Sequence, residues 1–178
     1  MDSWMADALA VLERGMELER EGNRFYAEAA ERTNDARGRA MFAALADDEL
    51  AHLRVLEEQH RSLRESGAWK APAVAYRPRD RSLEALSLFP RDPADVQKAI
   101  GANASELEAL QFGIHIEHKS YDFYDGLARA ARDEGERALF QRLAAEEEGH
   151  RKLLQATFDY LSDPAAWFQL QEKPIFEG

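Results

Sequence analysis

The sequence predicts an all-α fold, a four-helix bundle made of two repeated helical hairpins joined by a long crossover linker. Three observations predict it. The chain of 178 residues contains two similar segments, and the apolar residues of each segment recur at steps of three and four. Only 10 Gly and 6 Pro interrupt the sequence. Apolar residues at these steps lie on one face of an α-helix, so each segment is expected to form amphipathic helices.

The two segments align without a gap. A shift of 98 residues places 12–63 over 110–161, and 16 of the 52 aligned pairs are identical. The identical pairs include Glu19/Glu117, Phe25/Phe123, Tyr26/Tyr124, Asp35/Asp133, Phe42/Phe140, Leu45/Leu143, Ala46/Ala144, Glu49/Glu147 and His52/His150. A repeat of this kind indicates one supersecondary unit used twice.

The first hairpin is expected at about residues 3–67. Its first helix carries an inward stripe that includes Glu19 and Tyr26. Asp35 follows that helix, and Asp is a favoured N-cap for the next one. Gly67 can end the second helix, because glycine readily takes the left-handed conformation found after a helix.

The second hairpin, at about residues 105–162, repeats this plan with Glu117 and Tyr124 on one helix and Asp133 as the N-cap of the next. The linker between the hairpins, about residues 68–104, is long enough to cross the bundle, as a one-crossover four-helix fold requires. It contains Pro72, Pro78, Pro90 and Pro93.

Outside the hairpins, a short helix is expected at about Ser82–Phe89 within the linker. The tail, residues 163–178, is expected to be packed but not regular from Trp167 onward. Its apolar side chains can anchor it on the bundle or on a second subunit; they are Trp167, Phe168 and Phe176. The long linker and this tail favour a homodimer, since long hinges also permit chains to exchange elements. The whole chain, residues 1–178, is expected to form one domain.

Composition excludes several classes of protein. The chain has 34 acidic and 23 basic residues and a formal net charge of -11, which argues against a nucleic-acid partner and an anionic membrane surface. It has no cysteine, which excludes disulfides, thiolate-bound zinc and iron–sulfur centres. The sequence shows neither a signal peptide nor a run of about 20 apolar residues, so a cytoplasmic protein without a membrane span is expected.

Six polar residues interrupt the apolar stripes, and they carry the functional prediction. They are Glu19, Glu49, His52, Glu117, Glu147 and His150. Each hairpin contains a Glu-x-x-His motif, whose two side chains share one helix face because they are three residues apart. A further Glu stands 30 residues before the Glu of each motif, an offset that brings the two level across a tight hairpin. The six are therefore expected to meet at one height in the core.

The chemistry of these residues predicts a metal site. A single Glu of this kind is more often a charge that reaches solvent at the edge of a helix face, but four together are costly to bury without a counter-charge. Two divalent cations would balance four carboxylates and two neutral imidazoles. Glutamate and imidazole together suit iron or manganese, and zinc stays open.

Four longer motifs contain these residues. They are Glu-Arg-Glu-Gly-Asn-Arg-Phe-Tyr at Glu19–Tyr26, Glu-His-Lys-Ser-Tyr-Asp-Phe-Tyr at Glu117–Tyr124, and Phe-x-x-Leu-Ala-x-x-Glu-x-x-His at Phe42–His52 and Phe140–His150. The pattern resembles the ferritin-like di-iron carboxylate proteins, specifically the rubrerythrin family. The resemblance implies two iron ions bridged by Glu49 and Glu147, with the other four residues as terminal ligands. It also implies that Tyr26 and Tyr124, otherwise plain core aromatics, donate hydrogen bonds to ligand carboxylates.

Two departures from that family matter. Full-length rubrerythrins carry a rubredoxin domain that holds iron with four cysteines, and this chain has no cysteine. Any turnover would therefore draw electrons from a separate redox protein. Many relatives also carry an extra glutamate one turn after the third-helix ligand, where this chain has Ser120. The site is therefore expected to be a symmetric arrangement of six ligands.

The resemblance implies a non-haem di-iron peroxidase or oxidase, an oxidoreductase that reduces hydrogen peroxide or dioxygen as Fe(II) is oxidised. The alternative is an iron-binding protein for storage, delivery or sensing, with ferroxidase activity. A third reading is a structural bundle that keeps its ligands without catalysis.

Other polar residues near the six are given no part in the site. His60, His115 and His118 lie off the inward stripes and are expected at the surface or in packing. The acidic residues beside the motifs are expected to form a solvated face. The alternative is that some of them line a path by which iron reaches the site. These residues are Asp47, Asp48, Glu146 and Glu148.

Overall fold

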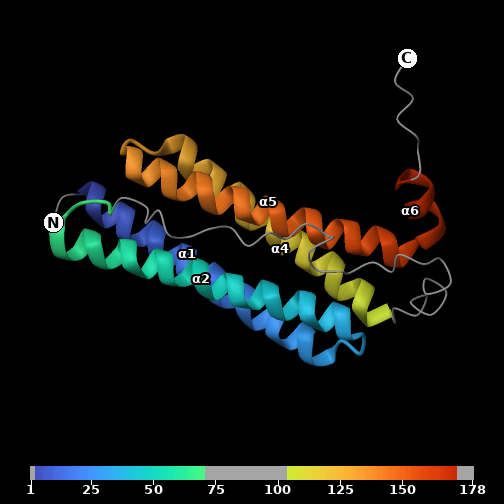
Figure 1. Cartoon of the computed structure of the whole chain (residues 1–178). Helices are drawn as coiled ribbons and strands as arrows, with labels where there is room; N and C mark the ends of the chain where they lie inside the picture. The colour runs from blue at the N-terminus through green and yellow to red at the C-terminus, as the bar shows by residue number, and fades with distance from the viewer. Residues whose placement is uncertain (1–2, 71–103, 172–178) are drawn as a thin grey trace, which may run out of the picture.

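The computed structural model describes residues 3–70 and 104–171, and every regular element within these ranges is an α-helix (Figure 1). The helices are α1 (Ser3–Arg32), α2 (Ala36–Ser66), α4 (Ala104–Ala130), α5 (Glu134–Ser162) and α6 (Pro164–Gln171). α1 packs along α2 and α4 packs along α5, which confirms the predicted bundle of two hairpins (Figure 1). The helix predicted at Ser82–Phe89 lies outside the described residues. None of the described helices is both long and apolar enough to span a membrane.

Asp35 and Asp133 are the N-caps of α2 and α5, as predicted. The carboxylate of Asp35 accepts hydrogen bonds from two N–H groups of the first turn of α2, at 2.9 and 3.1 Å. That of Asp133 accepts two from the first turn of α5, at 2.7 and 3.1 Å. These bonds satisfy N–H groups that have no partner inside the helix. At the other end of α2, Gly67 has a φ of 69° and donates its N–H to the carbonyl of Leu63 at 3.0 Å, as predicted for a residue that follows a helix.

Two apolar clusters fill the bundle, and the repeat relates them. One includes Leu12, Leu56, Tyr124, Ala128, Leu139, Phe140, Leu143 and Ala144. The other includes Leu110, Leu154, Tyr26, Ala30, Met41, Phe42, Leu45 and Ala46, each 98 residues from its counterpart in the first. Both clusters draw residues from both hairpins, so the hairpins share a core. On each of the four long helices, the predicted polar residues lie between the members of the two clusters, which therefore cover the polar layer from either side.

The tail is more regular than predicted. Residues Pro164–Gln171 form α6, at the far end of α5 (Figure 1). Asp163 accepts a hydrogen bond from the first turn of α6 at 2.9 Å, and Pro164 stands at the first helical position, where its missing N–H is no loss. The prediction of an irregular tail was wrong here because an Asp-Pro pair is itself a helix-start signal. Trp167 packs edge-on against Tyr160 of α5 with ring centroids 5.5 Å apart, which anchors α6 on the bundle.

Candidate metal centre

The structure places all six predicted polar residues together in the middle of the bundle. They are Glu19 on α1, Glu49 and His52 on α2, Glu117 on α4, and Glu147 and His150 on α5. Each has at most 4% of its surface exposed. Each hairpin thus contributes one Glu from its first helix and a Glu-x-x-His pair from its second.

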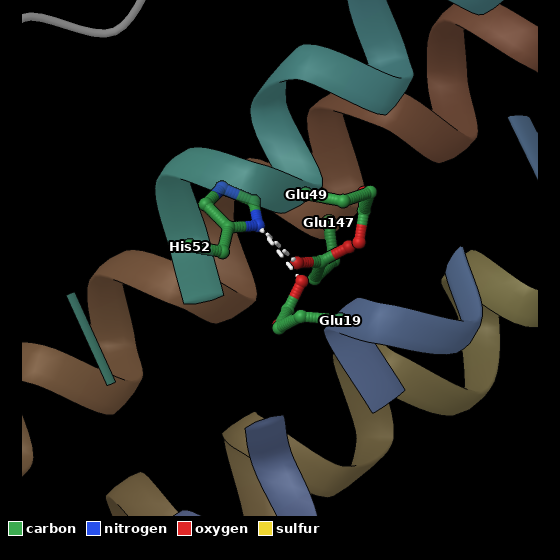
Figure 2. Close-up of side chains that lie close together, drawn as sticks. All are labelled: Glu19, Glu49, His52 and Glu147. Carbon is green, nitrogen blue, oxygen red and sulfur yellow. Dashed lines mark ion pairs between the residues drawn. The ribbon is translucent and has the colours of Figure 1, made fainter. Parts of the chain in front are cut away.

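The six residues form two overlapping groups. One consists of Glu19, Glu49, His52 and Glu147, whose side chains converge from α1, α2 and α5 in Figure 2. The other consists of Glu49, Glu117, Glu147 and His150. Within each group, one nitrogen or oxygen atom per residue lies within 4.8 Å of the others. Glu49 and Glu147 belong to both groups, so they stand between two potential metal positions.

Both histidines face the carboxylates through the same ring atom. Nδ1 of His52 lies 3.3 Å from Oε2 of Glu19 and 3.1 Å from Oε1 of Glu147 (Figure 2). Nδ1 of His150 lies 3.4 Å from Oε1 of Glu49. The two rings stack with centroids 5.6 Å apart. Each Nδ1 is therefore placed to share an ion with the carboxylates of its group.

Several atoms of this layer make no hydrogen bond within the described residues. They are Oε2 of Glu19, Oε1 of Glu49, Nδ1 of His52, Oε2 of Glu117 and both carboxylate oxygens of Glu147. A buried polar atom left in this way costs about 1–3 kcal/mol, and more when it is charged. Coordination to a metal would satisfy all of them, because each is an oxygen or nitrogen donor. The donor set therefore fits a pair of metal ions.

The four buried glutamates lie too close together for all of them to be ionised at once without a cation. Burial raises the pKa of Glu117 to about 8, and it also raises the pKa of Glu49, to which neighbouring carboxylates add. Burial alone would lower the pKa of His52 and of His150, but the adjacent carboxylates outweigh it and raise both. Burial opposes the ionisation of Glu147, yet the charge of His52 and the closeness of both histidine rings hold its pKa well below 4.5. Protons can thus balance the buried charge, and bound cations would displace them.

Two tyrosines hydrogen-bond the outer carboxylates, and both bonds cross from one hairpin to the other. The phenol of Tyr26 on α1 donates to Oε1 of Glu117 on α4, and the phenol of Tyr124 on α4 donates to Oε1 of Glu19 on α1. Burial, followed by the charge of the bonded carboxylate, raises the pKa of each phenol well above 10. Both tyrosines therefore keep their protons and act as donors.

Asp48 and Glu146 contact the far side of the two imidazole rings. Nε2 of His52 lies 3.1 Å from Oε2 of Glu146, and Nε2 of His150 lies 3.3 Å from Oδ2 of Asp48. A carboxylate can only accept a hydrogen bond, so each contact favours a proton on Nε2. Nδ1 is then left to face the predicted metal position, which is how outer contacts orient a histidine ligand.

The prediction of a solvated face was therefore wrong for these two residues. Asp48 is 2% exposed, and the side chain of Glu146 is 10% exposed. The error arose because a residue beside an inward-facing Glu becomes buried once a second hairpin packs over it. A signal was present, since Asp48 and Glu146 are themselves 98 residues apart and both acidic. The repeat therefore preserves a charge at this position as well as the ligands.

The remaining polar residues lie largely where predicted. Asp47, His115 and His118 are exposed. His60 lies near the surface, with Nε2 3.3 Å from Oε1 of Glu13. Glu148 lies on the outer side of α5, where Arg151 approaches it to 2.6 Å and holds its pKa at about 2. None of these residues contributes to either group of four.

This chain is similar to a known family in sequence and to a solved structure in fold. A family model described as Rubrerythrin matches residues 10–158. Among solved structures, a hypothetical protein from Pyrococcus furiosus is similar, with a TM-score of 0.62, 21% sequence identity, and coverage of 89% of this chain and 93% of that one. A likeness at this level of identity shows the fold alone. No curated protein matches the chain.

Proposed function

Because this chain belongs to the rubrerythrin family, we propose that it is a di-iron carboxylate oxidoreductase that reduces hydrogen peroxide or dioxygen. Its two iron ions would lie between the six buried residues, with Glu49 and Glu147 shared by both. Electrons would come from a separate redox protein, because the chain has no cysteine with which to hold an iron relay of its own.

One observation carries the proposal: the two groups of four donors share two carboxylates. Four carboxylates and two neutral imidazoles carry four negative charges, which two divalent cations would balance. Mixed glutamate and imidazole ligands suit iron and manganese better than magnesium or calcium. Family membership favours iron among these metals, and zinc is the competitor that metal analysis must exclude.

When bound, two ferrous ions would supply the two electrons that, with two protons, convert one hydrogen peroxide to two water molecules. The chain's own groups prepare the site for that reaction. Glu146 and Asp48 fix the histidine rings, and the two tyrosines hold the outer carboxylates. The two apolar clusters keep bulk water away from both sides of the layer, which strengthens every electrostatic contact within it.

The test is a single-turnover experiment. Chelator-treated protein is loaded with Fe(II) under nitrogen, mixed with hydrogen peroxide or with oxygenated buffer, and followed by near-ultraviolet absorbance of ferric iron. We expect two irons per chain and a rapid rise in absorbance with either oxidant. His150→Ala should abolish the rise in absorbance. His118 is an exposed histidine on α4, so His118→Ala should leave the rise unchanged.

The rival functions predict different outcomes. Iron handling predicts uptake well beyond two irons per chain, which colorimetric iron analysis would detect. A purely structural bundle predicts that wild type and His150→Ala behave alike with both oxidants. Either result would overturn the proposed oxidoreductase. Analytical ultracentrifugation of the same samples would test the predicted homodimer.

A further inference from the structure

The two halves of the repeat differ at a buried position one turn after Glu19 and Glu117. Glu19 and Glu117 are each followed, three residues later, by a small buried residue: Gly22 on α1 and Ser120 on α4. These two positions are 98 residues apart, so they occupy equivalent places in the two hairpins. Position 22 therefore lacks the side chain that its counterpart carries.

The backbone at Gly22 lies directly against the side chain of Glu49. A Cβ atom at position 22 would lie 2.8 Å from Oε2 of Glu49, 3.2 Å from Cδ and 3.4 Å from Cγ. The first distance is shorter than real Cβ atoms show to any neighbouring atom, so the carboxylate would have to move. The carboxylate of Glu49 can therefore occupy its place only because residue 22 has no side chain.

The two oxygens of Glu49 face different ways. Oε1 lies 3.4 Å from Nδ1 of His150, in the group that contains Glu117. Oε2 is the oxygen that lies against Gly22, on the helix that also carries Glu19. A side chain at position 22 would therefore displace the oxygen turned toward α1 and leave the other in reach of His150.

We propose that Gly22 is a positioning residue that lets Glu49 serve both metal positions. Any side chain at position 22 would leave one ion tightly bound, in the half formed by Glu49, Glu117, Glu147 and His150, and would weaken the binding of the other. This inference rests on the proposed two-metal site. It adds that the site's capacity for a second ion depends on a residue that offers no ligand atom.

The fold itself should tolerate the change. The atom that a Cβ would meet is the end of a flexible side chain rather than backbone, so Glu49 can rotate away. Alanine also favours helix over glycine, because glycine loses more conformational freedom on folding. The substitution should therefore act on metal binding and not on helix content.

The experiment compares Gly22→Ala with Gly149→Ala. Gly149 is also inside a long helix, but a Cβ there would meet nothing within 4 Å. Chelator-treated proteins are titrated with Co(II) by calorimetry, with visible absorbance recorded at each addition. Wild type and Gly149→Ala should bind two ions per chain. Gly22→Ala should bind one tightly, with affinity for the second reduced at least about 10-fold, the scale expected when a ligand is misplaced.

Double variants locate the remaining ion. In the Gly22→Ala background, adding His52→Ala should leave one ion bound, whereas adding His150→Ala should abolish binding. The double variant Gly22→Ala/Glu49→Asp shortens the displaced side chain and should restore part of the affinity for the second ion. It also relieves the contact between residues 22 and 49, so it can be tested even where Gly22→Ala alone folds poorly. Helix content is checked by circular dichroism without metal.

Two ions bound with wild-type affinity by Gly22→Ala would overturn the inference and leave the proposed function standing. Loss of binding with His52→Ala rather than His150→Ala in that background would overturn it too. Fewer than two ions in wild type would instead defeat the proposed two-metal function. The two failures are therefore distinguishable in one titration series.

Discussion

Tyr124 on α4 donates its hydrogen bond to Glu19 on α1, although Tyr26 stands on the same helix as Glu19. The reason is helix geometry. Seven residues along an α-helix span about 10 Å, which is too far for a direct bond between a tyrosine and a glutamate on one helix. The neighbouring hairpin supplies a phenol at the right height instead. Each of these tyrosines therefore connects the two hairpins at the level of one carboxylate.

Tyr124→Phe should weaken the binding of one metal ion by about 10- to 100-fold, because the carboxylate of Glu19 loses the bond that orients it. The ring and its packing are retained. Competition with a coloured chelator would measure the affinity. Tyr121→Phe, a half-buried tyrosine on the same helix, should have no such effect. Equal affinities in the two variants would mean that the phenol does not orient the ligand.

Glu146→Gln should also lower the affinity for one metal ion, by about 10-fold. The reason is that the imidazole of His52 loses the charge that holds its proton on Nε2. Asp48→Asn should do the same to the other ion through His150. Glu148→Gln changes a neighbouring carboxylate on the outer side of α5 and is the matched control. Metal titrations of the three variants would measure these affinities. If Glu148→Gln weakened metal binding as much as Glu146→Gln, Glu146 would not be the residue that orients His52.

The metal-free protein should become less stable as pH rises from about 5 to 9. The pKa of Glu117 is about 8 in the folded protein and 4.5 ordinarily, so its stabilising contribution is complete below pH 4.5 and lost as pH passes 8. Glu49, His52 and His150, whose pKa values are also raised, act in the same direction. Glu147 acts oppositely, but its contribution is lost only as pH falls below 4.5.

Urea unfolding with chelator at pH 6, 7, 8 and 9 would measure this effect. The free energy of unfolding should fall by more than about 1 kcal/mol, since each pKa unit corresponds to about 1.4 kcal/mol. Glu117→Gln should flatten the profile. With metal present the trend should reverse, because ligands must lose their protons to bind. A metal-free profile that rose with pH would show that these carboxylates are not held protonated.

Asp133→Ala should lower the free energy of unfolding by about 1 kcal/mol, because two N–H groups of α5 lose their acceptor. Asp35→Ala should cost a similar amount at the start of α2. Asp122→Ala removes an exposed carboxylate on α4 and should change stability by less than about 0.5 kcal/mol. Urea denaturation of the metal-loaded proteins would compare all three, and a cost at Asp122 equal to that at Asp133 would rule out the capping explanation.

Much of the fold and of the candidate metal centre could be predicted from local signals in the sequence. The helices followed from apolar residues at steps of three and four, and their starts followed from Asp35 and Asp133. The repeat of 98 residues singled out the six buried residues that the structure brings together. The helical start of the tail was not predicted, although Asp163 followed by Pro164 is a helix-start signal.

The sequence by itself determined which residues lie at one height, because spacing along a helix fixes the height and face of each side chain. Only the tertiary structure decided which residues meet across the bundle. The pairing of Tyr124 with Glu19, the contacts of Asp48 and Glu146 with the histidines, and the closeness of Gly22 to Glu49 all depend on it. Such contacts depend on the relative rotation and separation of two helices. Those are set by the packing of whole hairpins, which no spacing within one helix encodes.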